Sequence, residues 1–333
     1  MKISVIGAGS WGTAVSRLLA KKGFNVCLWA REKEIADSIN STHHNNHYLS
    51  DIVLPANLVS ANVLKEALAG AQVVVLAVPS QFMRAAVKEI SPILNNAVPV
   101  LSLAKGIELG TSSRMSQVIK EELPEGFENK IAVLSGPNHA EEVSKEIPSA
   151  TVISAIDSKV AVKLQEIFMT PYFRVYTNND LVGVEIAAAV KNVIAIASGM
   201  SDGLGFGDNT KASLMTRGLA EMTRLGVYFG ASALTFSGLS GVGDLIATCT
   251  SKHSRNRSLG ERFVKGKSLE TIAKETKMVA EGAKTCLALR DISRKAQIDM
   301  PINDAVVQVL HEDKDPLEVV RSLMGRHPTE ENH

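Results

Sequence analysis

Hydrophobic and polar positions follow two different periods along the chain. In residues 1–180, short apolar runs alternate with longer amphipathic segments, a pattern typical of strands alternating with helices. We expect strands at residues 3–6, 25–29, 73–78, 100–103, 131–134 and 151–154, and a helix at 11–22 that ends before Gly23. Some of these strands are apolar throughout, which is typical of a parallel sheet covered on both faces.

Residues 181–333 carry mainly the helical period. The apolar spacing predicts helices at 182–198, 210–226, 259–264, 283–295, 302–311 and 316–324, with Pro301 and Pro316 in first turns. Strand signals are weak in this half. We therefore predict an α/β domain with a doubly wound sheet over residues 1–180, followed by an all-α domain over 181–333.

A glycine motif lies directly after the first apolar run. Gly7, Gly9 and Gly12 fit the pattern G-x-G-x-x-G, between a strand and a helix, as in a Rossmann dinucleotide-binding domain. Gly7 would form the tight turn, Gly9 would let the backbone approach a pyrophosphate, and Gly12 would let helix and strand pack closely. The helix N-terminus would then present N–H groups to the anion.

The end of the second predicted strand bears on cofactor choice. An arginine there suits the 2′-phosphate of NADP, whereas an acidic residue suits the ribose hydroxyls of NAD. Arg31 occupies this place and Glu32 follows it. We expect NADPH to be preferred and NADH to remain possible. The alternative is that Arg31 is a solvated surface cation.

Composition excludes several classes of protein. The 333 residues are 45% hydrophobic and 21% charged, with a formal net charge of +1, which argues against disorder and against a polyanionic partner such as nucleic acid. No apolar run is expected to span a membrane. Three cysteines without zinc spacing indicate a cytoplasmic protein with reduced thiols. The cluster His43-His44-Asn45-Asn46-His47 reads as a polar loop, and we expect no metal.

Four further features suggest chemistry. Lys105 follows a predicted strand, so it should lie at the ligand-binding edge of the sheet. Lys191 is surrounded by apolar residues and is either a snorkelling lysine or a proton-transfer group with a lowered pKa. Asp244, in Gly243-Asp244-Leu245, is a positioned carboxylate or a helix N-cap. Ser254–Arg257 gathers two guanidiniums, a hydroxyl and an amide, which suits a phosphate, unless it is an exposed basic turn.

Taken together, these residues resemble the bacterial NAD(P)-dependent sn-glycerol-3-phosphate dehydrogenases over nearly the whole chain. The most specific segments are Gly7–Gly12, Ser102–Gly106, Ser135–Glu142, Val190–Ala195, Thr216–Met222, Gly243–Leu245, Thr248-Cys249 and Ser254–Arg257. The family reduces dihydroxyacetone phosphate to sn-glycerol 3-phosphate, the backbone of glycerophospholipids, and runs the reverse oxidation. The resemblance implies a cytoplasmic enzyme, commonly a homodimer.

The resemblance also implies roles for individual residues. Lys191 matches the proton-transfer residue. The implied cofactor contacts are Ser10, Trp11, Arg31, Tyr48, Phe82, Lys105, Ala140, Arg255, Val279 and Glu281. The implied substrate contacts are Lys105, Gly136, Asn138, Lys191, Asn192, Asp244, Ser254, Arg255 and Asn256. Asn138 departs from the family, where Ser or Thr is usual, although an amide can replace a hydroxyl as a hydrogen-bonding partner.

Three other readings are open at this point. A 6-phosphogluconate or β-hydroxyacid dehydrogenase shares the layout but separates its catalytic lysine and asparagine, which are adjacent here as Lys191-Asn192. A non-catalytic NAD(P)-sensing regulator would need the glycine motif but not Lys105, Lys191, Asp244 and Arg255 together. A cofactor-independent binding protein is disfavoured by the glycine motif.

Overall fold

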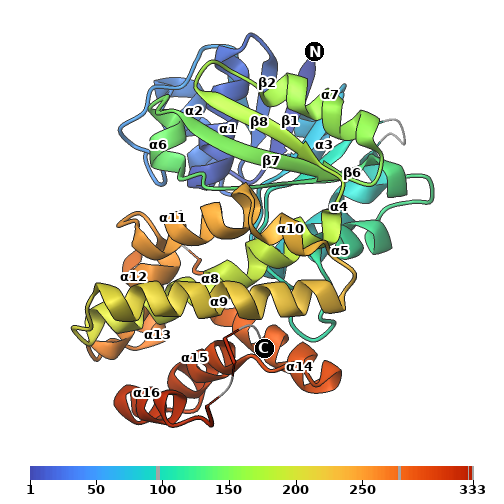
Figure 1. Ribbon diagram of the computed structural model, residues 1–333. Coiled ribbons are helices and arrows are strands. Elements are labelled where there is room, and N and C mark those ends of the chain that lie inside the picture. The colour runs from blue at the N-terminus through green and yellow to red at the C-terminus, as the bar shows by residue number, and fades with distance from the viewer. Residues whose placement is uncertain (95–97, 277–278, 329, 332–333) are drawn as a thin grey trace.

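One eight-stranded sheet forms the core of the first half of the chain. The computed structural model describes residues 1–94, 98–276, 279–328 and 330–331. The strand order is β3-β2-β1-β4-β5-β6-β7-β8 (Figure 1). The strands are β1 (Lys2–Ile6), β2 (Asn25–Trp29), β3 (Leu58–Ala61), β4 (Val73–Leu76), β5 (Val100–Ser102), β6 (Ile131–Ser135), β7 (Ser149–Ala155) and β8 (Phe173–Asn178). Strands β1–β6 are parallel, and β7 runs antiparallel to β6.

Helices cover both faces of this sheet, which confirms the doubly wound prediction. They are α1 (Ser10–Lys21), α2 (Lys33–Thr42), α3 (Leu64–Leu68), α4 (Met83–Ile90), α5 (Met115–Glu122), α6 (Ala140–Ser144) and α7 (Ser158–Phe168). Successive side chains of one strand enter different cores: Val73 and Val75 join one apolar cluster, Val74 and Leu76 another. This two-sided burial explains the continuous apolar character of the strand.

All six predicted strands are present, and two strands were not predicted. Both β3 and β8 lie at edges of the sheet, and alternate residues of each are exposed. An edge strand with one solvent-exposed face carries polar residues at every second position, so its sequence resembles that of a loop.

The second half of the chain is all-helical within the described residues, as predicted. Its helices are α8 (Leu181–Gly203), α9 (Asp208–Tyr228), α10 (Ala233–Phe236), α11 (Asp244–Thr250), α12 (Arg255–Val264), α13 (Leu269–Thr276), α14 (Gly282–Ala296), α15 (Pro301–His311) and α16 (Pro316–Met324). The short helices α10, α11 and α13 were not predicted, because a few turns carry too little periodicity to recognise.

Helix α8 is the centre of the helical half (Figure 1). It packs against α9, α11, α12 and α14. Helix α12 approaches α8 closely because Gly260 has no side chain: a Cβ there would lie 2.0 Å from the carbonyl oxygen of Ile196. By length and hydropathy alone α8 would be able to cross a membrane, but 89% of its most apolar window is buried inside the protein.

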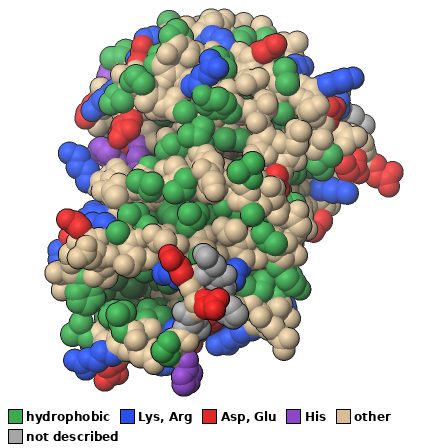
Figure 2. All heavy atoms as spheres, in the orientation of Figure 1, with side chains coloured by type: hydrophobic (Ala, Val, Ile, Leu, Met, Phe, Trp, Pro, Cys, Tyr) green, Lys and Arg blue, Asp and Glu red, His purple; other side chains and the backbone are tan. Residues whose placement is uncertain are grey.

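A buried ion pair joins α8 to the sheet domain. The carboxylate of Glu185 on α8 accepts hydrogen bonds from the backbone N–H (2.7 Å) and hydroxyl (2.6 Å) of Ser116 in α5. It also pairs with the guanidinium of Arg114. On the outer surface, acidic and basic side chains are interspersed over the face seen in Figure 2, in keeping with the net charge of +1.

Candidate active site

A pocket lies between the carboxyl ends of the parallel strands and the helices α8, α11 and α12. It brings together residues that sequence analysis had selected from distant parts of the chain. These are Ser10, Trp11, Lys105, Asn138, Ala140, Lys191, Asn192, Asp244, Ser254, Arg255, Asn256, Val279 and Glu281. The convergence depends on the fold, because the parallel strands end at one edge and α8 crosses it.

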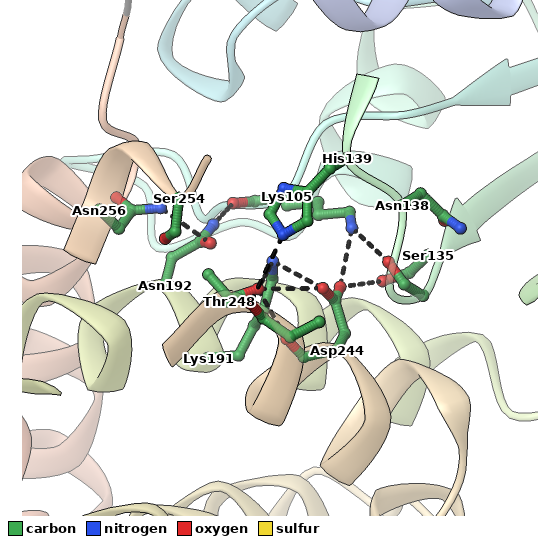
Figure 3. Close-up of polar contacts among 12 residues, drawn as sticks. Lys105, Ser135, Asn138, His139, Lys191, Asn192, Asp244, Thr248, Ser254 and Asn256 are labelled. Atoms are coloured by element: carbon green, nitrogen blue, oxygen red, sulfur yellow. Dashed lines mark hydrogen bonds and ion pairs between the residues drawn. The ribbon is translucent and has the colours of Figure 1, made fainter. Parts of the chain in front are cut away.

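Two lysines share one buried carboxylate at the base of the pocket (Figure 3). Lys191 Nζ lies 2.9 Å from Asp244 Oδ1, and Lys105 Nζ lies 2.7 Å from Asp244 Oδ2. Lys191 and Asp244 are both buried. Lys191 is therefore not a snorkelling lysine. Asp244 begins α11, yet its carboxylate is bound to the two ammonium groups, so the N-cap alternative does not account for it.

The Lys191 ammonium is held in one orientation. Its second hydrogen bond is donated to Thr248 Oγ1 at 2.7 Å, and the Thr248 hydroxyl in turn donates to the backbone oxygen of Asp244 at 2.6 Å. An ammonium has three hydrogens, so one remains for a further acceptor in the pocket.

The surroundings shift the pKa values of this pair in a consistent way. Burial lowers the pKa of Lys191 to about 8, with Asp244 opposing the shift and Lys105 adding to it. For Asp244, burial favours the neutral acid, but the charges of Lys105 and Lys191 together hold its pKa below the ordinary value. A lysine that exchanges its proton near neutral pH is suited to general acid–base catalysis.

A chain of amides connects the lysines to α12. Asn192 Nδ2 donates to the backbone oxygen of Lys105 at 2.7 Å, and Asn256 Nδ2 donates to Asn192 Oδ1 at 3.0 Å. Asn256 Oδ1 accepts from the backbone N–H of Gly282 at 3.0 Å. The Asn256 side chain is thus largely engaged within the protein, which leaves one amide hydrogen and its backbone N–H for a ligand.

The N-terminus of α12 forms a cationic end of the pocket. Ser254 is the N-cap, and its hydroxyl oxygen accepts from the backbone N–H of Arg257 at 3.2 Å. The hydroxyl hydrogen of Ser254 remains available. Arg255 is exposed beside it, and its guanidinium donates to the backbone oxygen of Val279 at 3.4 Å. Hydroxyl, guanidinium and helix N–H groups together suit a phosphate. The second guanidinium of the predicted cluster, that of Arg257, does not take part, because it pairs with Asp202 at 2.7 Å and does not line the pocket.

The glycine loop after β1 is shaped for a dinucleotide. Gly7 has φ +115°, and a Cβ there would lie 2.7 Å from the backbone oxygen of Ala77. At Gly9 a Cβ would meet nothing within 4 Å, so the space before α1 is open. No side chain of the described residues caps α1, which leaves its first N–H groups for a pyrophosphate. Trp11 Nε1 is a buried donor that has no hydrogen-bond partner in the part of the chain that the structure describes.

Three predicted cofactor residues do not line the pocket. Arg31 follows β2, and its exposed guanidinium pairs with Glu32 at 2.7 Å. The backbone oxygen of Tyr48 accepts from the Ser10 hydroxyl at 3.0 Å. Phe82 lies before α4 with 54% of its surface exposed. The cofactor contacts expected of these residues stay predictions.

Gly136 and Glu281 hold Lys105 from two sides. The backbone oxygen of Gly136 accepts from Lys105 Nζ at 2.9 Å, and a Cβ at Gly136 would lie 2.9 Å from Thr151 Cα. The carboxylate of Glu281 accepts from the backbone N–H groups of Ser80 (2.6 Å) and Lys105 (3.3 Å). Glu281 thereby ties the start of α14 to the loops after β4 and β5.

Some residues of the pocket were not selected from the sequence. These are Leu103, His139, Glu141, Thr248 and His253. Thr248 belongs to Thr248-Cys249, one of the segments that carry the family resemblance. Nothing in the sequence, however, indicated its hydrogen bond to Lys191. His139 and His253 are isolated histidines in sequence, and only the fold places their rings 6.1 Å apart. Within the described ranges, no group of three or more His, Cys, Asp or Glu is placed to hold a metal ion.

Comparisons with known proteins agree with this geometry. Residues 2–161 match the family model described as NAD-dependent glycerol-3-phosphate dehydrogenase N-terminus, and residues 180–321 match the model of its C-terminus. A glycerol-3-phosphate dehydrogenase [NAD(P)+] of Clostridium perfringens is 49% identical over 98% of this chain and 97% of its own length. The same holds for one from Streptomyces coelicolor.

Solved structures support the same relationship. The glycerol-3-phosphate dehydrogenase of Coxiella burnetii superposes with a TM-score of 0.93 at 36% identity, covering 98% of this chain and 99% of that one. A D-mandelate dehydrogenase bound to NADH shares 14% identity at a TM-score of 0.66, which is a likeness of fold alone.

Proposed function

The chain belongs to the NAD-dependent glycerol-3-phosphate dehydrogenase family, and we propose the following roles for its residues in that reaction. It is an NAD(P)-dependent oxidoreductase that interconverts dihydroxyacetone phosphate and sn-glycerol 3-phosphate. Family membership excludes the three other readings of the sequence. The product is the backbone of glycerophospholipids, and we place the enzyme in their synthesis.

Lys191 is the proton donor in the reductive direction. The substrate phosphate binds Ser254, Arg255 and the N-terminus of α12, which directs the carbonyl toward the base of the pocket. The third ammonium hydrogen of Lys191 then points to the carbonyl oxygen and is transferred to it. NAD(P)H supplies the hydride. Lys105 and Asp244 hold the ammonium in place, and in the oxidative direction neutral Lys191 is the base.

The observation that carries this assignment is the buried Lys191 between Asp244 and Thr248. It predicts opposite pH dependences for the two directions. Reduction needs charged Lys191, so its kcat should fall as pH rises through about 8, while the kcat of oxidation should rise through the same pH. Steady-state rates between pH 6 and 10 in both directions test this. Profiles that share one direction, or show no ionisation near pH 8, would contradict it.

Residues around the glycine loop bind the cofactor. Gly7, Gly9 and Gly12 shape the turn, and Ser10, Trp11 and Ala140 meet the cofactor where the pocket opens. Tyr48, Phe82, Lys105, Arg255, Val279 and Glu281 complete the proposed contacts. Substrate contacts are Gly136, Asn138, Asn192, Asp244 and Asn256, together with the groups named above.

Arg31 favours NADPH over NADH. Replacing it by aspartate should weaken NADPH binding by roughly 10- to 100-fold, the worth of a charge-assisted hydrogen bond, and weaken NADH binding much less. Dissociation constants for both cofactors measure this. Lys33→Asp is the matched control, because Lys33 is a neighbouring exposed cation that already pairs with Asp37 at 2.6 Å. Equal losses for both cofactors in Arg31→Asp would show that Arg31 does not read the 2′-phosphate.

We further propose that the protein is a cytoplasmic homodimer whose partners are small molecules. We also propose that each chain is divided into a cofactor domain at residues 1–180 and a substrate domain at residues 181–333. The division rests on Asp180, which caps α8 by accepting from the backbone N–H of Gly183 at 2.8 Å.

A further inference from the structure

The side chain of His139 lines the pocket but has no part in the reaction as described so far. His139 lies between β6 and α6 and is half-buried in the wall of the pocket. Its ring extends from the loop after β6 toward Thr248 in Figure 3. Lys191, Lys105 and Asp244 line the same pocket, and their charges act on the ring.

One ring nitrogen of His139 is committed to the protein. Nε2 lies 3.4 Å from the backbone oxygen of Ala247, which can only accept a hydrogen bond, so Nε2 carries the hydrogen. Burial, together with the nearby ammonium groups of Lys191 and Lys105, lowers the pKa of His139 and keeps the ring neutral near pH 7. Nδ1 is then a hydrogen-bond acceptor, and no described residue donates to it.

The substrate requires such an acceptor. Dihydroxyacetone phosphate carries a phosphate and a carbonyl, which accept hydrogen bonds, and one terminal hydroxyl, which must donate. The base of the pocket is rich in donors: the ammonium groups of Lys105 and Lys191 and the cationic end at Arg255. A hydroxyl bound without an acceptor would leave its donor unsatisfied at a cost in affinity.

Most other acceptors of the pocket already have donors. Asp244 is bonded to both lysines and Thr248, and Glu281 to two backbone N–H groups. Asn138 Oδ1 has no partner among the described residues but is fully buried, and its amide is fixed by a 3.1 Å bond to the backbone oxygen of Ala150. Glu141 and His253 also line the pocket and are the remaining competitors.

We infer that His139 is a specificity-determining residue whose Nδ1 accepts a hydrogen bond from the terminal hydroxyl of the three-carbon substrate. This inference rests on the proposed function and adds to it how the enzyme distinguishes a hydroxymethyl ketone from a methyl ketone. No bond is made or broken by His139.

The test compares dihydroxyacetone phosphate with hydroxyacetone phosphate, which lacks only that hydroxyl. The ratio of their kcat/KM values is measured for the full-length enzyme with NADPH. His139→Asn and His139→Gln distinguish the contributions of the two ring nitrogens. An Asn side chain places its oxygen near the position of Nδ1, whereas the Gln amide reaches the position of Nε2. His139→Asn should keep the ratio. His139→Gln and His139→Phe should lower it about tenfold, through slower reaction of dihydroxyacetone phosphate alone.

Glu141→Gln and His253→Phe are the controls in the same pocket, and their ratios should stay near that of the unaltered enzyme. An unchanged ratio in His139→Gln and His139→Phe overturns the inference, as does a ratio that falls in either control instead. Slower turnover of both substrates by the same factor would assign His139 a structural role and also overturn it. If the unaltered enzyme oxidises no NADPH with dihydroxyacetone phosphate, the proposed function fails, which is a distinct outcome.

Discussion

Lys191→Ala should lower kcat for the reduction of dihydroxyacetone phosphate by at least about 10²–10⁴-fold, the usual contribution of a general acid. The variant removes the only proposed proton donor but leaves Asp244 paired with Lys105 at 2.7 Å. No unpaired buried charge results, so the protein should fold. Binding of NADPH should persist, because the glycine loop is not touched.

Three measurements separate chemistry from structure in this variant. Circular dichroism and thermal unfolding report the fold, and fluorescence titration reports NADPH binding. Added primary alkylamines should restore part of the rate if the cavity left by the side chain admits them, since they supply the missing ammonium. Turnover near that of the unaltered enzyme would exclude Lys191 as the acid.

Asp244→Asn should have the second large effect, on stability as well as on rate. Asp244 is buried between two ammonium groups, and breaking a buried ion pair on one side costs about 3–5 kcal/mol of unfolding free energy. This loss should be greatest well below pH 8, where Lys191 is charged in the unaltered protein. It should shrink as pH rises through about 8, the pKa of Lys191 in the unaltered protein, because neutral Lys191 needs no counter-ion.

The same variant should shift the pH profile. Asp244 opposes the lowering of the Lys191 pKa, so its removal should lower that pKa below about 8. The fall in the kcat of reduction should then begin at lower pH. Asp202→Asn is the matched control, because Asp202 also pairs with two cations, Lys211 and Arg257, outside the pocket. It should lose stability without moving the pH profile; an identical shift in both variants would contradict the role given to Asp244.

Local patterns in the sequence predicted most of the fold. Helix and strand periods carry information over a few residues, and they located the six inner strands and the long helices. They failed at β3 and β8, where one face is exposed, and at helices of a few turns. The glycine motif was predictable because three local features each require glycine at a set spacing. These are a tight turn, a backbone that a pyrophosphate can approach, and close packing of the helix on the strand.

The arrangement of the site was less predictable than its members. Lys191 was selected for its apolar neighbours, but its partners Asp244 and Thr248 lie 53 and 57 residues further on and meet it only through the packing of α11 on α8. The engagement of Asn256 with Asn192 and Gly282 likewise depends on the fold. His139 lay within the family segment Ser135–Glu142 but was given no role, because the chemistry of a single histidine beside a short helix is ambiguous.

The bonds of Glu281 bear on how the protein is made. Its carboxylate holds the backbone N–H groups of Ser80 and Lys105, which precede it by 201 and 176 residues. When the whole sheet domain has left the ribosome, Glu281 has therefore not yet been added to the chain. The carboxylate that holds two loops of the domain is still missing at that stage. During synthesis the sheet domain emerges first. The loops at Ser80 and Lys105 gain their hydrogen bonds to Glu281 only after the last fifth of the chain has been made. The proposed cofactor site is therefore expected to be complete only in the finished polypeptide, because a nascent chain that ends before Glu281 lacks these two bonds.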